Sequence, residues 1–185
     1  MAVLAGCLAL SPRARTTGYD RGMTGASGAP LDSAHAEFIQ GGVSVILGTR
    51  NASMVPDAVR GCGCRVSPDR RRVTVFVDRE RAAGLLDDLA ASRAIAVVFS
   101  QPSTHRTIQL KGTDAAAVRI QASDRRLVAA HRAAWIADLE SIGYARAFAE
   151  ALWGSLPGAL AAIAFTPSAA FQQTPGPAAG QPLER

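Results

Sequence analysis

The stretch RRVTVFVDRERAAGLLDDLAASRAIAVVFSQPSTHRTIQLKG, residues 71–112, decides the fold because it predicts three strands and one helix. Residues 72–77 are β-branched or aromatic after the first position, which is typical of a strand. Residues 79–91 carry apolar side chains at the spacing i, i+3, i+4, i+7, which predicts a helix with one buried stripe. Asp78 stands where the cap of that helix belongs.

The second half of this stretch predicts two more strands. Residues 94–100 are apolar on both faces, which favours a central strand that is covered on both sides. Residues 107–111 form the next predicted strand, which ends at Gly112 and can resume after a bulge over residues 116–120.

The preceding residues predict the beginning of the same sheet. A short helix that ends at Ile39 leads into a β-rich run at residues 43–47. Residues 54–66 predict a strand that is bent or bulged, because a proline and a glycine interrupt it. Short turns join this strand to its neighbours, and such connections predict an antiparallel meander.

The following residues predict two helices and a last strand. Ser123 is placed to cap a long helix that reaches Ile142, residues 144–153 predict a second helix, and residues 160–165 predict a strand. The order is therefore strands, helix, strands, two helices, strand. It differs from the alternation of a doubly wound fold and predicts an α+β barrel of about six mostly antiparallel strands, with helices packed outside.

Composition places the boundaries of this domain. Residues 1–32 are rich in small residues without any period and predict a disordered tail, or an overlong translation start before Met23. Residues 33–170 form the predicted barrel domain, and residues 171–185 form a tail rich in proline and glycine.

The positive charge of the chain is not concentrated in a nucleic-acid motif. The net charge is +5, from 20 Lys and Arg against 15 Asp and Glu, and Lys111 is the only lysine. The densest basic run, residues 70–72, lies in a predicted turn, and no zinc-finger spacing or basic helix is present. The most apolar stretch, residues 147–165, is interrupted by Glu150 and by Pro157 and is too short for a membrane span of ~20 residues. We expect neither nucleic acid nor membrane as a partner.

The cysteines predict an intracellular protein without structural disulfides or metal. Cys62 and Cys64 are separated by one glycine, which fits neither a disulfide framework nor a usual zinc half-site. On a regular strand both thiols point to the same face, as plain strand residues. We expect a reducing, cytoplasmic location.

A polar strand face is the first candidate site. Because side chains alternate along a strand, His105, Thr107, Gln109 and Lys111 share one face, and Arg106 lies on the other with two apolar residues. Such donors suit an anionic or hydrogen-bonding ligand, although a face that simply meets solvent explains the pattern equally well.

Four arginines are further candidates: Arg50, Arg60, Arg79 and Arg81. Arg79 and Arg81 fall in the first turn of the predicted helix, where free backbone amides and the helix dipole favour an anion. None of the common nucleophile, phosphate-loop, dinucleotide or zinc-protease motifs is present, so no catalytic residue is assigned.

These patterns together resemble one family. Residues 71–112 resemble the core of the pyridoxamine 5′-phosphate oxidase-like proteins, residues 43–66 (VSVILGTRNASMVPDAVRGCGCRV) resemble their first hairpin, and residues 171–180 (FQQTPGPAAG) resemble a tail of some members. The resemblance implies a homodimeric split β-barrel that holds FMN in grooves between the subunits.

The resemblance also implies roles for individual residues. Arg79 and Arg81 take the place of a basic helix start that grips the FMN phosphate, and Arg106, Thr107 and Gln109 fall where the family makes further flavin contacts. With Lys111, these form the predicted cofactor-binding set. The C-terminal Arg-Leu-x-Pro ending of the true oxidase is missing. The expected function is an FMN-binding oxidoreductase or reductase with a small-molecule substrate; a non-catalytic binding or sensing protein with FMN, deazaflavin or haem is the alternative.

Overall fold

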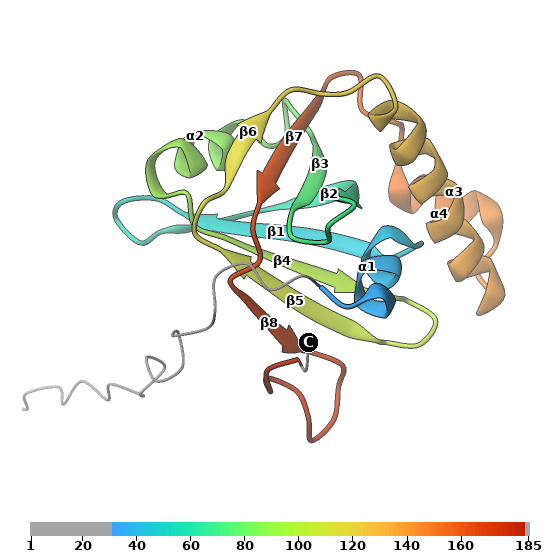
Figure 1. Ribbon diagram of the computed structural model, residues 1–185. Coiled ribbons are helices and arrows are strands. Elements are labelled where there is room, and N and C mark those ends of the chain that lie inside the picture. Colours follow the sequence, from blue (N-terminus) through green and yellow to red (C-terminus); the bar gives the residue numbers. More distant parts are fainter. Residues whose placement is uncertain (1–30, 184–185) are drawn as a thin grey trace, which may run out of the picture.

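The computed structural model describes residues 31–183, which contain four helices and one sheet of eight strands (Figure 1). Nearly all of the predicted N-terminal tail lies outside the described residues. The helices are α1 (Ser33–Gln40), α2 (Ala83–Ser92), α3 (Asp124–Ser141) and α4 (Arg146–Trp153). The strands are β1 (Ser44–Arg50), β2 (Pro56–Val66), β3 (Val73–Asp78), β4 (Ile95–Ser100), β5 (Thr107–Gly112), β6 (Ala116–Val118), β7 (Leu160–Phe165) and β8 (Ala169–Gln172).

The sheet has the order β6-β7-β3-β2-β1-β4-β5-β8, and every neighbouring pair is antiparallel. It curls until β5 meets the end of β7, although no ladder joins these two strands. A Cβ added to Gly112 would lie only 2.7 Å from the ring of Phe165, so a glycine is required at this close approach. The backbone amide of Ser168 also donates to the carbonyl of Lys111, at 2.8 Å. The predicted α+β split barrel is therefore confirmed, with eight strands instead of about six.

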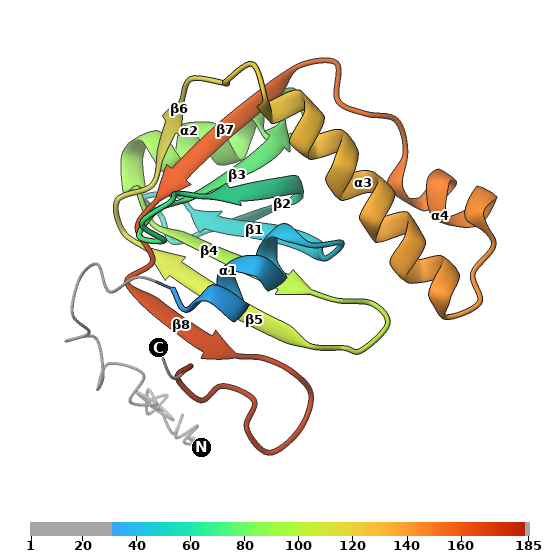
Figure 2. The same cartoon turned by 45° about the vertical axis from the view of Figure 1, so that its right-hand side comes forward.

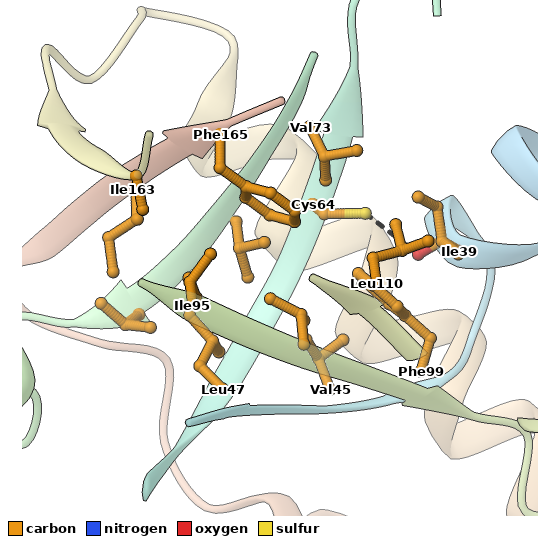
Figure 3. Close-up of a cluster of buried hydrophobic side chains, with 14 of the residues drawn as sticks. Ile39, Val45, Leu47, Cys64, Val73, Ile95, Phe99, Leu110, Ile163 and Phe165 are labelled. Atoms are coloured by element: carbon orange, nitrogen blue, oxygen red, sulfur yellow. Dashed lines mark hydrogen bonds between the residues drawn. The ribbon is translucent and has the colours of Figure 1, made fainter. Parts of the chain in front are cut away.

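The curled sheet encloses one apolar core, part of which is drawn in Figure 3. Strands from both halves of the sheet contribute to it, among them β1 through Leu47, β4 through Phe99 and β7 through Phe165. The helices α1 and α2 add side chains to the same core from opposite ends of β2. Near one end the Cys64 thiol donates to the carbonyl of Ile39, and near the other a Cβ on Gly84 of α2 would meet Asp57.

The helices α3 and α4 lie together outside the barrel, as Figure 2 shows. The helix α3 packs against β2 and α4, and a small cluster that includes Val128 and Phe76 joins it to the outer side of β3 and β7. The connection between α1 and β1 touches α3 closely, because a Cβ on Gly42 would lie 2.5 Å from the backbone of Ala134. The Ser123 side chain makes no capping hydrogen bond; instead the buried Asp124 carboxylate accepts from the amide of Gln121.

The structure corrects the start of the helix that was predicted over residues 79–91. The Asp78 carboxylate accepts hydrogen bonds from the amides of Glu80 and Arg81, at 3.0 and 3.2 Å, and closes a turn instead of capping a helix. The helix α2 begins only at Ala83. Arg79 and Arg81 therefore precede the helix and are not in its first turn.

One strand was not predicted, and one expectation about a strand was wrong. The unpredicted strand is β8, whose four residues lie on both sides of the boundary placed at residue 170. Cys62 and Cys64 do not share a face, because a bulge shifts the register of β2 between Gly61 and Cys64. Gly63, with φ +124, provides the backbone conformation that the bulge requires. As a result Cys64 enters the inner core, whereas Cys62 packs on the outer side.

Candidate functional site

The outer face of the sheet is partly open to solvent and carries most of the candidate residues. Ile46, in the middle of β1, is 44% exposed, whereas its neighbours Val45 and Leu47 are buried in the core. The register places Arg60, Ile46 and Val98 side by side across β2, β1 and β4, and Gln109 of β5 continues the row. One row of the outer face thus links Arg60 with a predicted ligand contact.

The polar face predicted on β5 is present from Thr107 onward. Thr107, Gln109 and Lys111 are partly exposed, and they alternate with the fully buried Ile108 and Leu110. Thr107 is engaged within the chain, because its hydroxyl lies 2.7 Å from that of Ser100 and its amide donates to Thr174.

His105 is placed differently from the prediction, whereas Arg106 contacts a residue of the inner core. His105 lies before the strand, in a turn with φ +57, so it does not extend the polar face. The guanidinium of Arg106 lies 4.2 Å from the centre of the Phe38 ring, and this contact directs it toward α1. The position of His105 in an exposed turn removes it from the polar face, and the cofactor role expected for Arg106 stays a prediction.

Arg81 lines a hollow of about 230 Å³ that we call the arginine hollow. Its walls come from β2, the end of β3, and the segment that joins α4 to β7. Besides Arg81 they include Ala58, Arg60, Cys62, Asp78 and Trp153. Arg79 is not among the lining residues, so the structure separates the two arginines that the sequence had grouped.

Arg60 is the most constrained cation at the arginine hollow. Its guanidinium lies 4.9 Å from the centre of the Trp135 ring and 5.2 Å from that of Trp153, and it donates to the carbonyl of Leu152 at 3.1 Å. Cation–π contacts of this kind hold a guanidinium in a fixed place. Burial lowers the pKa of Arg60 from its ordinary value, because desolvation disfavours the charged form. An anion placed beside it would offset this loss of hydration.

The two other ionisable groups at the arginine hollow are Asp78 and Cys62. Asp78 uses one carboxylate oxygen to bind the two amides of its turn. Burial is the largest cause that raises the pKa of the Cys62 thiol, to about 11, and a hydrogen bond with the backbone of Asp78 partly opposes it. The thiol is therefore neutral at neutral pH and is not an activated nucleophile.

Lys111 lies apart from Arg81. It lines a second hollow of about 510 Å³, at the end of β5 and beside the turn between β1 and β2. The two hollows adjoin on the outer face, where Ala58 of the first pairs with Gly48 of the second across the ladder. The predicted cofactor set is thus divided between two neighbouring places.

Trp153 is a wall of the site that the sequence did not identify. Its position just before Gly154 indicated only the end of a helix, and nothing local predicted that its ring would meet Arg60. Within residues 31–183, no group of three or more His, Cys, Asp or Glu side chains is arranged to hold a metal ion. None of the helices in this range has the length and apolar character needed to cross a membrane.

No protein-family model matches the sequence, and no curated protein matches it as a relative. Solved structures of similar shape include HupZ of Group A Streptococcus, with a TM-score of 0.49, 13% identity, and coverage of 81% of this chain and 99% of that chain. A pyridoxamine 5′-phosphate oxidase-related, FMN-binding protein of Nostoc punctiforme has a TM-score of 0.46 and 17% identity, with 85% and 89% covered. An F420 reductase has a TM-score of 0.43 and 12% identity, with 76% and 98% covered.

Because the identities are at most 17% and the TM-scores lie below 0.5, the fold rests on the strand order and the enclosed core of this chain.

Proposed function

We propose that this protein binds FMN or a related phosphorylated flavin, pairs with a second copy, and acts as an oxidoreductase on a small molecule. The observation that supports this most is the placement of Arg60 and Arg81 at one hollow beside the indole of Trp153. Arginine is suited to a phosphate group, because its planar fork of donors matches two phosphate oxygens.

The electrostatics of the arginine hollow favour an anionic occupant. Among residues 31–183, neither Arg60 nor Arg81 forms a salt bridge with a carboxylate, and Asp78 is the only acidic residue that lines the hollow. Arg60 is already partly desolvated, so a phosphate would meet a preorganised positive charge. Arg81 is exposed and can turn toward a ligand at little cost.

The size of the arginine hollow favours a cofactor site that is shared between two copies of the chain. Its volume of about 230 Å³ is below the ~300–1,000 Å³ of usual ligand pockets, so one copy would enclose only part of a cofactor. The open outer face, with Ile46 at its centre, offers an apolar surface on which a second copy would complete the enclosure.

A bound flavin would supply the electron or hydride transfer. The residues of this chain would bind and orient it: Arg60 and Arg81 at the phosphate, Trp153 as an aromatic wall, and Gln109 as a hydrogen-bonding group on the same row of the sheet as Arg60. Cys62 stays protonated and adds a neutral wall.

A binding protein without catalysis is the second candidate. Among residues 31–183, no histidine lines the arginine hollow, and burial keeps the Cys62 thiol protonated at neutral pH. The names of the similar structures suggest FMN and F420 as the first compounds to assay.

The test is FMN retention by the purified protein, measured by gel filtration and by the flavin absorbance spectrum. Arg81→Ala should weaken FMN binding about tenfold or more, because a charge-assisted bond to phosphate is lost. Arg79→Ala is the matched control, since Arg79 is an equally exposed arginine two residues away that does not line the hollow. Equal losses in the two variants, or no retention by the unmodified protein, would contradict the proposal.

A further inference from the structure

The second hollow, which we call the methionine hollow, has the properties of a separate ligand site. Its volume of about 510 Å³ lies within the ~300–1,000 Å³ range of small-molecule pockets. It lies where β1 ends, β4 begins and β5 ends, and Met54 of the turn between β1 and β2 forms one wall.

The hollow exists because the residues around it have small side chains. Gly48, Ala96 and Gly112 line it on three neighbouring strands. Within residues 31–183, a Cβ on Gly48 would meet only carbonyl oxygens, at 3.8 and 4.0 Å, so none of these residues places a side chain within 4 Å of that position. At Gly112 a side chain would collide with the ring of Phe165.

Met54 lies beside this space in a turn that several hydrogen bonds stabilise. The side-chain oxygen of Asn51 accepts from the amides of Ser53 and Val55, and the Asn51 carbonyl accepts from the amide of Met54. Met54 has φ +64, a conformation that a glycine would adopt more easily. The methionine side chain is nevertheless 65% exposed, and its flexible thioether suits contact with an apolar ligand of variable shape.

The charge at the methionine hollow is positive. Arg50 and Lys111 line it, and none of its lining residues within 31–183 is acidic. The two nearest acids along the chain face elsewhere: Asp57 is directed toward Gly84 of α2, and Asp114 accepts from the amide of Thr166. A ligand here would therefore meet two cations and a largely apolar wall.

From these features we propose that the methionine hollow binds a small apolar anion, in particular a flat aromatic compound that carries one carboxylate or sulfonate group. The aromatic part lies over Gly48 and Ala96 against Met54, and the anionic group faces Arg50 and Lys111. This site adjoins the arginine hollow through the Ala58–Gly48 pair but does not depend on a cofactor there.

The experiment uses two fluorescent probes that differ in one charged group: anilinonaphthalene sulfonate, an anion, and N-phenylnaphthylamine, which is neutral. Binding to the full-length protein is measured by fluorescence titration. Met54→Glu should weaken binding of the anionic probe about tenfold or more, because it places a like charge against the ligand. Val55→Glu is the matched control: Val55 is 56% exposed in the same turn but does not line the hollow, so its variant should change the affinity less than about twofold.

A charge variant tests the class of ligand. Arg50→Gln combined with Lys111→Gln should weaken the anionic probe about tenfold and leave the neutral probe within about twofold. Equal effects of Met54→Glu and Val55→Glu would overturn the site, and equal losses of both probes in the charge variant would overturn the preference for an anion. FMN retention by the Met54→Glu variant separates this proposal from the proposed function. Unchanged retention is expected if the two sites are distinct. A loss of FMN would show that the methionine hollow is part of the cofactor site.

Discussion

The inner core of the barrel and the layer between α3 and β2 are both buried, but they differ in whether their buried polar atoms have hydrogen-bond partners. In the core the side chains are almost entirely apolar, and the one thiol there, Cys64, donates to the Ile39 carbonyl (Figure 3). In the layer under α3, both ring nitrogens of His131, the Trp135 indole nitrogen and Nε of Arg132 are buried, and none of these atoms has a hydrogen-bond partner among residues 31–183. Buried polar groups without partners cost stability, so in the layer under α3 this cost offsets part of the stabilisation from apolar packing, whereas the core has little such cost.

The largest effect is expected in the inner core. Phe165 is fully buried and contacts the backbone region of Gly112, so Phe165→Ala should lower the free energy of unfolding by about 3–5 kcal/mol. Urea denaturation measures the loss. Leu156→Ala is the control, since that side chain is 48% exposed and its truncation should cost no more than about 0.5 kcal/mol. Similar losses in both variants would show that the core is not the main source of stability.

The layer under α3 should respond to pH more strongly than the core does. Burial is the largest cause that lowers the pKa of His131 from 6.5 to about 4; the carbonyls of Gly41 and Val43 face the ring without reaching full hydrogen-bond geometry. The folded state therefore keeps this histidine neutral, and its stabilising contribution is complete above pH 6.5. As the pH falls from 6.5 toward 4, the unfolded state takes up the proton first, and up to about 3 kcal/mol is lost.

Chemical denaturation at several pH values tests this expectation. His131→Phe should flatten the stability profile between pH 6.5 and 4, whereas His105→Asn should leave it unchanged, because His105 is exposed and an asparagine tolerates its positive φ. A profile that keeps its slope in His131→Phe would assign the dependence to another group.

The smallest effect is expected at Trp135. Trp135→Phe removes an unpartnered indole N–H, which is a gain, and weakens the contacts with Trp153 and Arg60, which is a loss. The two changes oppose each other, so the free energy of unfolding should change by less than about 1 kcal/mol. In the core, Ile163→Val removes one methylene from a fully buried side chain and should cost about 0.5–1.5 kcal/mol. A loss above about 2 kcal/mol for Trp135→Phe would show that lost packing, or a hydrogen bond of the indole nitrogen, outweighs the gain.

The two regions also differ in how well the sequence predicted them. The strands of the core followed from β-branched runs and from alternation, as on β5, where Ile108 and Leu110 point inward. The strand β8 was missed because its residues form a strand only where β5 offers an edge for pairing. The start of α2 was misplaced because Asp78 can cap a helix or close a turn, and its local sequence does not distinguish these two roles.

The candidate site depended more on tertiary contacts. Arg81 was predicted from its expected place in the first turn of a helix, but its separation from Arg79 follows from the turn that Asp78 closes. Trp153 meets Arg60 only because α4 folds back over β2, a contact between residues 93 positions apart. The glycine between the two cysteines indicates the position of the bulge, since a glycine inside a strand often marks one.

The order of strands in the sheet bears on the synthesis of this protein. The strand β3 has β7 as one of its two neighbours, and β5 has β8 as one of its own. Both β7 and β8 lie after residue 159, so neither pair can form before that part of the chain is made. While the chain emerges from the ribosome, β1 to β5 appear before β7 and β8, so a meander formed from them would have both outer strands unpaired. Long-range pairing of this kind slows folding and exposes strand edges to other nascent chains. The arrival of β7 and β8 would therefore be the step that turns an aggregation-prone intermediate into a closed domain.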